Sequence, residues 1–306
     1  MAALPPAPLP SPLLRRRLPV LAGLGVALAL ALYYPVGAWR AHVIDDNPKF
    51  DAGAVQSGGS RAVAQAAGLI RREIDAHGWT PNKPFFMPAS ILTAMPSYQK
   101  GVMSGVGRFA IIISGQDADL QRAAELLKYP PTVWMIDPAA PWANTLSAEK
   151  QYRNAARAFE AFNQRLAAGK ATWERRGEAL AVLLDGLGAD LDELAASLDD
   201  ALAGSSGWFD RRGEKVYYAG KGHAYALLLV LTALGEDFAP VLAENGLTDA
   251  WQAMLASLVP AATAAPLMVQ AGAADALLLP NHPAIQGFHL LRARSRMAAV
   301  ATVLRR

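Results

Sequence analysis

The feature that most constrains the fold is an apolar repeat in the middle of the chain. From Tyr152 to Ala201 an apolar residue recurs at nearly every seventh position, and later in the stretch another follows four residues after it. Alternating spacings of four and three are typical of a long helix with one narrow apolar seam, as in a coiled coil. Other helices of the chain or a second copy must cover this seam. Its members are Tyr152, Phe159, Leu166, Trp173, Leu180, Leu184, Leu187, Leu191, Leu194, Leu198 and Ala201.

A glycine within this stretch limits the length of the helix. Gly169 predicts a break, which would give an antiparallel pair over residues 148–168 and 170–203. Ser147 is the expected N-cap of the first helix. One continuous helix over 148–203 stays open as an alternative.

Composition extends the helical prediction to the whole body. Apolar residues make up 53% of the chain and charged residues 18%, which suffices for a large core. Ala and Leu dominate and Arg is frequent, all of them good helix formers, and alternating runs of β-branched and aromatic residues are scarce. We therefore predict an all-α protein, with a multi-helix bundle after an N-terminal transmembrane helix. The net charge of +3, without basic clusters among aromatics, gives no support for nucleic-acid binding.

The chain has one segment suited to crossing a membrane. Residues 18–39 carry no charge, and as a helix these 22 residues would be about 33 Å long, close to the thickness of a bilayer's hydrocarbon core. Aromatic rings at its far end suit the membrane interface. The residues that we assign to the anchor are Leu18, Leu24, Leu28, Leu32, Tyr33, Tyr34 and Trp39.

The charges around this segment predict its orientation. Arg15, Arg16 and Arg17 precede it, whereas Arg40 and Lys49 follow it, which favours a cytoplasmic N-terminus. Residues 1–17 would then be a disordered, proline-rich cytoplasmic arm. The alternative is a cleaved signal peptide, but that would have a shorter apolar region and a better cleavage site.

The remaining chain divides into a connector, residues 40–57, and a helical domain, residues 58–306, with a candidate internal boundary at 129–146. The connector contains Asp45-Asp46-Asn47-Pro48, which we interpret as an Asp/Asn-Pro turn because it lacks the ligand spacing of a calcium loop. Ser60 and Asn281-His282-Pro283 are helix start signals. Gly101, Gly105 and Gly107 would allow another helix to approach closely, although Lys100 and Arg108 interrupt the apolar stretch and ordinary core packing is the expected role.

Several phrases along the chain occur together in one known family. The chain resembles a proteobacterial family catalogued as domain of unknown function 2333, over nearly its whole length. The resemblance implies an inner-membrane-anchored protein of Gram-negative bacteria with a periplasmic body, and it supplies no catalytic residues. The phrases are Asp45-Asp46-Asn47-Pro48, Gly58-Gly59-Ser60-Arg61-Ala62-Val63-Ala64, Gly78-Trp79-Thr80, Gly207-Trp208-Phe209-Asp210, Leu279-Pro280-Asn281-His282, Gln286-Gly287-Phe288 and Leu290-Leu291-Arg292-Ala293-Arg294.

The sequence contains no recognisable catalytic, cofactor or metal motif. It lacks cysteine, a nucleophile elbow, a phosphate-binding loop and a His-Glu-x-x-His pair. His282 and His289 would share a helix face, but two ligands are too few for a zinc site. A cell-wall hydrolase acting through Glu73, Glu160 or Glu178 is the enzymatic alternative. A pocket near Trp134 or Trp208 would instead indicate an envelope sensor for a small ligand.

Two groups of residues are candidates for contacts with a partner. Trp79, Trp134 and Trp142 lie in proline-rich loops, where they would bind a partner or cover the helical core. The last helix carries a basic face that would suit an acidic partner or anionic lipid. Its candidate residues are Asn281, His282, Gln286, His289, Arg292 and Arg296, to which Arg294, Arg305 and Arg306 add charge.

We therefore predict a membrane-anchored helical scaffold or adaptor of the bacterial cell envelope. Its expected partners are the lipid bilayer through residues 18–39 and an envelope protein, and a second copy is a further candidate through the seam.

Overall fold

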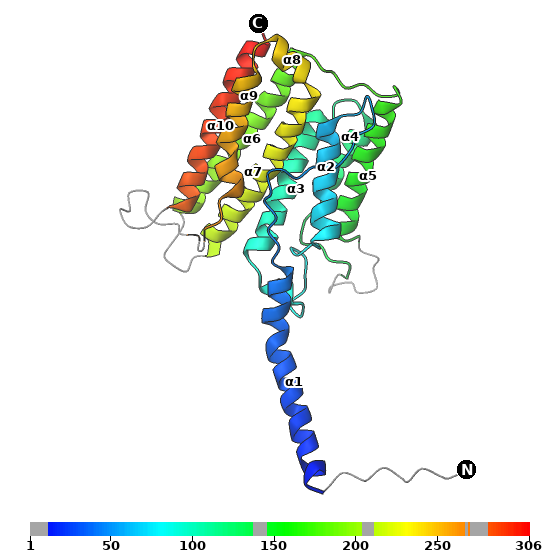
Figure 1. Ribbon diagram of the computed structural model, residues 1–306, viewed down its shortest axis with the longest axis vertical. Helices are drawn as coiled ribbons and strands as arrows, with labels where there is room; N and C mark the ends of the chain where they lie inside the picture. Colours follow the sequence, from blue (N-terminus) through cyan, green and yellow to red (C-terminus); the bar gives the residue numbers. More distant parts are fainter. Residues whose placement is uncertain (1–11, 137–145, 204–210, 267–268, 270–280) are drawn as a thin grey trace, which may run out of the picture.

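The computed structural model describes residues 12–136, 146–203, 211–266, 269 and 281–306 (Figure 1). This part of the chain is helical and contains no strand, so the all-α prediction is confirmed. The helices are α1 (Pro12–Ala41), α2 (Arg61–Arg71), the π-helix η1 (Arg72–Ala76), the 3-10 helix η2 (Pro88–Ile91), α3 (Ala94–Ile113), α4 (Ala118–Leu127), α5 (Ala148–Ala167), α6 (Gly177–Ala203), α7 (Arg211–Asp237), α8 (Ala239–Glu244), α9 (Thr248–Thr263) and α10 (His282–Leu304).

The helix α1 projects from one end of the body, as Figure 1 shows. Its segment Pro19–Ala41 is long and apolar enough to cross a membrane, and the body buries none of its most apolar part. Of the predicted anchor residues, Leu18 lies in the helix, Tyr34 is half-buried, and Leu24, Leu28, Leu32, Tyr33 and Trp39 are exposed. The helix begins at Pro12, so it includes the last residues of the predicted arm, and residues 1–11 lie outside the described part.

The centre of the body is the contact between α3 and α7. These two helices touch through glycines. A Cβ on Gly101 would overlap the Ala219 carbonyl, and a Cβ on Gly222 would overlap the Tyr98 carbonyl. Gly105 lies against His223 in the same way. Tyr98 is fully buried beside this contact. The close approach predicted for Gly101 and Gly105 is therefore correct, and α7 is the helix that uses it, whereas a Cβ on Gly107 would make only an ordinary contact with Leu127 of α4.

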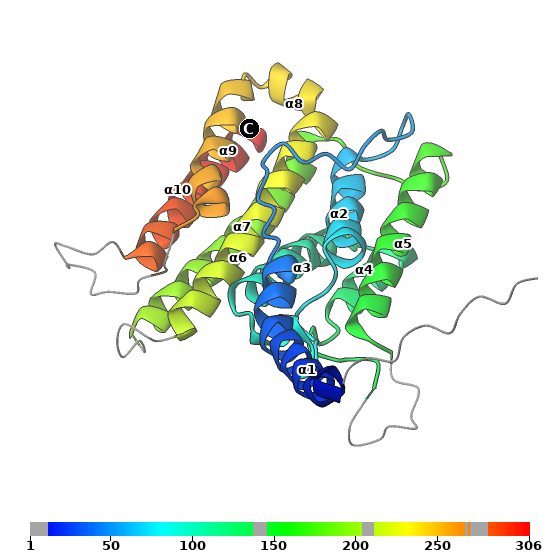
Figure 2. The same cartoon turned by 60° about the horizontal axis from the view of Figure 1, so that its bottom comes forward.

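The other helices cover the two sides of this pair (Figure 2). On one side α2, α4 and α5 pack together, and on the other α6, α9 and α10 do so. One continuous apolar core includes residues from α2 to α10. Since α4 and α5 pack against each other, the candidate boundary at 129–146 lies between two helices that share this core.

The apolar seam is covered within the chain. Gly169 has φ +69° and follows the end of α5, so the predicted break is correct, but α6 begins at Gly177 rather than at 170. The two helices do not form the predicted antiparallel pair, because α5 packs on α2 and α4 whereas α6 packs on α10. The seam residues whose burial is described lie in or against the core. The seam is therefore not a surface for a second copy.

Helix ends follow the local signals in most places. Ser60, Asp117, Ser147 and Asn281 accept hydrogen bonds from the first turns of α2, α4, α5 and α10, as an N-cap should. Pro260 does not end a helix, since α9 runs through this residue to Thr263.

Substitution of Gly101 by alanine should destabilise the protein. The added methyl group must push α3 away from α7, and overpacking of this kind costs about 1–3 kcal/mol. Denaturant unfolding of the full chain in detergent micelles, followed by circular dichroism, measures the effect. Gly188→Ala is the matched control, because its Cβ would meet the Arg294 side chain at an ordinary 3.9 Å. Equal stability of the two variants would contradict the close contact.

Candidate functional site

The site with the densest polar chemistry is the junction between anchor and body. It begins with the turn at Asp45, Asp46 and Asn47. The Asp45 carboxylate accepts a hydrogen bond from the Asn47 N–H at 3.1 Å, and the Asn47 side chain accepts one from Lys49 N–H at 3.0 Å. The predicted Asp/Asn-Pro turn is confirmed.

The body holds this turn from three helices, an arrangement that we call the connector lock. The Tyr98 hydroxyl donates to the Asp45 carbonyl at 2.7 Å, and the Tyr225 hydroxyl donates to the Asn47 carbonyl at 2.8 Å. The Lys221 ammonium lies 2.7 Å from the Asp46 carboxylate, and the whole Lys221 residue is only 1% exposed. It also donates to the Ala264 carbonyl at the end of α9. A buried ammonium with these partners requires the connector to stay in place.

Arg72 completes the lock from the first turn of the π-helix. Its guanidinium donates to Glu73 at 2.9 Å and to the Tyr225 hydroxyl at 2.7 Å, and it lies 3.5 Å from the Asp45 carboxylate. It also lies over the Phe50 ring at 4.4 Å. Burial by itself would lower the pKa of Arg72, but attraction to Glu73 and the contact with Tyr225 raise it above its ordinary value. The arginine therefore remains charged inside the body.

Glu73 is the buried carboxylate of the lock, and its surroundings account for its role. Its second oxygen faces His77 at 3.5 Å and the Gln99 amide at 3.4 Å. The Gln99 amide also donates to the Gly78 carbonyl, and its oxygen accepts from Thr80. The π-helical turn places Arg72, Glu73 and His77 around this point. Glu73 thus fixes the end of α2 and is completely buried there.

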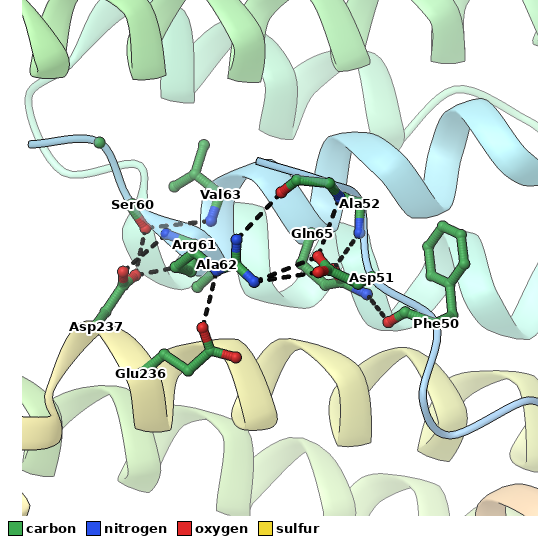
Figure 3. A network of polar contacts seen from close by, with 12 residues as sticks. Phe50, Asp51, Ala52, Ser60, Arg61, Ala62, Val63, Gln65, Glu236 and Asp237 are labelled. Atoms are coloured by element: carbon green, nitrogen blue, oxygen red, sulfur yellow. Dashed lines mark hydrogen bonds and ion pairs between the residues drawn. The ribbon is translucent and has the colours of Figure 1, made fainter. Parts of the chain in front are cut away.

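Residues 50–53 of the connector run along α2 and are bonded to it (Figure 3). The Gln65 amide donates to the Phe50 carbonyl at 2.9 Å and accepts from the Ala52 N–H at 3.0 Å. Arg61 donates to the Gly53 carbonyl at 3.1 Å and pairs with Asp51 at 3.3 Å. The Gln65 side chain thus bonds to one carbonyl and one N–H of the connector, as a neighbouring strand would, and holds residues 50–52 extended.

The connector ends at a capped helix start. The Asp237 carboxylate, from the end of α7, accepts from the Ser60 hydroxyl at 2.6 Å and from the Arg61 N–H at 2.7 Å (Figure 3). The Asn163 amide of α5 bonds both to the Ser60 N–H at 2.7 Å and to its carbonyl at 3.0 Å. An anion at a helix N-terminus is favoured by the free N–H groups and the helix dipole. The body is therefore joined to its anchor by a connector that is held from Asp45 to Gly53 and again at Ser60.

The structure separates the glutamates proposed for catalysis. Glu73 is fully buried, and Glu178 is exposed on the first turn of α6. Glu160 lines a cavity of about 610 Å³ between the connector, α2 and α5. Both of its oxygens accept hydrogen bonds from Arg71, each at 2.9 Å. Glu160 thus borders a cavity, and it does so as part of an ion pair with Arg71.

The aromatic candidates occupy different environments. Trp79 is buried, donates to the Pro131 carbonyl at 2.9 Å and packs edge-on against Tyr152, so it covers the core. Trp134 is half-buried, and its ring lies 5.9 Å from that of Phe86. Trp142 and Trp208 lie outside the described residues. A second cavity of about 910 Å³ borders Trp173 and not Trp134.

The last helix is less basic on its surface than its sequence suggests. Arg294 pairs with Asp192 at 2.9 Å, Arg305 pairs with Asp185, and Arg296 donates to the Ala253 carbonyl. These contacts hold α10 against α6 and α9. Arg292 is exposed.

The remaining candidates on α10 are largely internal. Asn281 and Gln286 are buried, and Gln286 donates to the Ala261 carbonyl at 3.2 Å. His282 packs edge-on against Tyr217, with ring centres 6.2 Å apart. Burial, with the charge of Arg292, lowers the pKa of His289. Among the described residues no group of three or more His, Asp or Glu is placed to hold a metal.

The connector lock was not predicted from the sequence, although the sequence contains a signal for it. Lys221 and Tyr225 stand four residues apart in a helix that is otherwise strongly apolar there, and Arg72 and Glu73 interrupt the apolar face of α2. Polar residues at buried periodic positions indicate a specific internal partner. Nothing in the sequence identifies the turn at Asp45 as that partner.

Substitution of Tyr225 by phenylalanine should weaken the lock. It removes the hydrogen bonds to Asn47 and Arg72 inside the body, and we expect a loss of about 1–3 kcal/mol in the free energy of unfolding. Denaturant unfolding of the full chain in micelles measures this loss, and limited proteolysis detects a freed connector. Tyr218→Phe is the control, because no hydrogen bond of its hydroxyl occurs in the described part. Equal losses would contradict the lock.

The same tyrosine predicts an alkaline limit of stability. Burial raises the pKa of Tyr225 from 10.0 to about 12. Above pH 10 the unfolded chain loses this proton while the folded chain keeps it, so the free energy of unfolding should fall between pH 10 and 12. The decline should be shallower in the Tyr225→Phe variant, and a decline of equal slope in both proteins would argue against this tyrosine as a contributor.

Comparisons with known proteins return no relative of this chain: no protein-family model, no curated protein and no solved structure matches it. The resemblance to domain of unknown function 2333 therefore stays a prediction. Function must be inferred from the geometry of the junction and of the surfaces around it.

Proposed function

We propose that this chain is a membrane-anchored scaffold of the bacterial cell envelope, with α1 in the inner membrane, its N-terminus in the cytoplasm and its body in the periplasm. The observation that carries the proposal is the connector lock. A body joined to its anchor by a fixed connector keeps the same face toward the membrane. Such an orientation serves a protein that presents one surface to a partner, whereas a freely tethered body would not hold it.

The character of α1 supports the anchoring part of the proposal. The segment Pro19–Ala41 has the length and hydropathy of a membrane span, and the body buries none of its most apolar part. In water this would be a large exposed apolar surface, which soluble proteins avoid. The three arginines before the span favour a cytoplasmic N-terminus.

The first half of α10 is the surface that we assign to a protein partner. Ile285, Phe288 and Leu291 are exposed there, at spacings that place them along one side of the helix, and Arg292 is exposed next to them. An apolar patch beside an exposed arginine has the composition found in protein interfaces. The apolar seam cannot serve this purpose, because the chain's own helices cover it.

The absence of cysteine allows a clean test of topology. We expect a membrane-impermeant maleimide to label Ser57→Cys, an exposed position in the connector, in intact spheroplasts. Ser11→Cys should be labelled only after the membrane is lysed. The unmodified chain is the control, since it has no thiol. The reverse pattern would contradict the orientation, and loss of residue 11 from the mature protein would indicate a cleaved signal peptide instead.

A cell-wall hydrolase is the second candidate, favoured only by the position of Glu160 on the wall of a cavity. Incubation of the full chain in micelles with purified peptidoglycan sacculi, followed by mass spectrometry of released fragments, separates the two functions. A scaffold releases none. Fragments that disappear in Glu160→Gln and persist in the exposed control Glu178→Gln would replace our proposal with the hydrolase.

A further inference from the structure

A group of exposed apolar side chains lies beside the point where α1 meets the body. Phe85 is 84% exposed and Met135 58%, which are high values for such residues. Both come from loops at the same end of the molecule. We call this group the apolar collar, and its members are Phe85, Phe86, Ile91, Met135 and Ile136.

The collar belongs to two loops that are held together. The Phe86 ring lies against Trp134, at 5.9 Å between ring centres. The Asn82 amide donates to the Val133 carbonyl at 3.0 Å, which joins the two loops at their bases. The collar therefore has one arrangement, and its exposed rings are not the ends of a loose segment.

Direct contacts place the collar beside α1. The Tyr34 hydroxyl donates to the Phe85 carbonyl at 3.0 Å, and the Tyr33 hydroxyl donates to the Phe86 carbonyl at 3.2 Å. Further along the helix, Gly37 lies so close to Pro88 that a Cβ there would overlap the proline ring. In Figure 1 the body meets α1 along these last turns.

These contacts give the depth of the collar relative to the span. Tyr33 and Tyr34 precede the end of α1 at Ala41 by eight and seven residues, which corresponds to about 10–12 Å along the helix axis. If the segment Pro19–Ala41 lies in the bilayer, the phenylalanines at this level lie within its outer zone. Tyrosines at the end of a span favour the same zone.

The backbone around the phenylalanines is suited to a poorly hydrated place. Pro84 and Pro88 have no N–H group, and the carbonyls of Phe85 and Phe86 already accept hydrogen bonds from α1. The Met87 N–H bonds to the Pro84 carbonyl at 2.9 Å. Pairing of this kind lowers the cost of moving backbone groups out of water.

The loop also carries little charge. Between Thr80 and Leu92 the one charged residue is Lys83, and its ammonium lies 3.2 Å from the Glu149 carboxylate. Glu149 accepts a further hydrogen bond from Asn82 at 2.7 Å. No unpaired charge in this loop therefore opposes its entry into lipid.

We infer that the apolar collar inserts into the interfacial layer of the bilayer that holds α1, so that the body rests on the membrane as well as being tethered to it. The inference depends on the proposed membrane anchoring. Lipid is the occupant that the geometry favours, because a bilayer around α1 would surround the collar at the same depth. A peptide or a second copy would have to displace that lipid.

A fluorescent probe attached to single cysteines tests this placement. The full chain, which has no native cysteine, is labelled with a nitrobenzoxadiazole dye at Phe85→Cys and reconstituted in liposomes of phosphatidylethanolamine and phosphatidylglycerol that contain spin-labelled phosphatidylcholine. Spin labels are placed near the headgroups in one preparation and along the acyl chain in another, so that both the interface and the middle of the span are probed. At Phe85 we expect a blue-shifted emission and strong quenching by the labels near the headgroups. Met135→Cys, on the other loop, gives a second measurement if the first variant does not fold.

Two controls make each result decisive. Leu28→Cys lies within the span, and Val182→Cys is similarly exposed, at 64%, but lies near Ile112 at the far end of α3. Quenching at Phe85 and Leu28 but not at Val182 supports the inference. Quenching at Leu28 alone overturns it and leaves the anchor intact, even if the dye at Phe85 is shifted by a protein contact. No quenching at Leu28 overturns the anchoring proposal and the inference together.

Discussion

The body depends on the contact between α3 and α7, because every other packing layer is built on this pair. Gly101, Gly105 and Gly222 remove the side chains that would keep the two helices apart, so that backbone meets backbone. The short distance between the helices then allows α2, α4 and α5 to pack on one side and α6, α9 and α10 on the other without a gap at the centre. Interiors are close-packed, so a change in this distance would propagate to both layers.

The same pair creates the place where the connector is held. Tyr98 of α3 and Tyr225 of α7 lie side by side, with ring centres 6.1 Å apart, and their hydroxyls both reach connector carbonyls. Lys221 and Arg72 bring buried positive charges to the carboxylates of Asp46 and Asp45. Breaking one partner of a buried ion pair is costly, since the other is left without compensation. Orientation of the body relative to its anchor is thus tied to the stability of the core.

Much of the candidate site could not be predicted, for reasons that differ between residues. Trp79, Asn281 and Gln286 were conspicuous in the sequence because aromatic and polar residues in loops and at helix starts often serve binding, yet all three are buried. The Trp79 indole and the Gln286 amide donate to backbone carbonyls, and the Asn281 side chain accepts from the Ala284 N–H. The last helix is basic in composition, but Arg294 and Arg305 pair with acidic residues of α6 that are about a hundred positions away in the chain. Pairing over such distances leaves no local pattern.

The sequence by itself determined the features that arise from neighbours along the chain. The apolar run, the N-caps at Ser60, Asp117 and Ser147, the break at Gly169 and the turn at Asp45 depend on backbone propensity and on hydrogen bonds a few residues apart. Only the tertiary structure decided which surfaces were covered. The heptad seam predicts that another apolar surface covers it. Because hydrophobic packing is not directional, the seam can pack against any complementary face. In the folded protein α6 packs on α10 and α7, and α5 packs on α2 and α4. The apolar collar, by contrast, is left exposed, because it lies at the end of the body from which α1 projects.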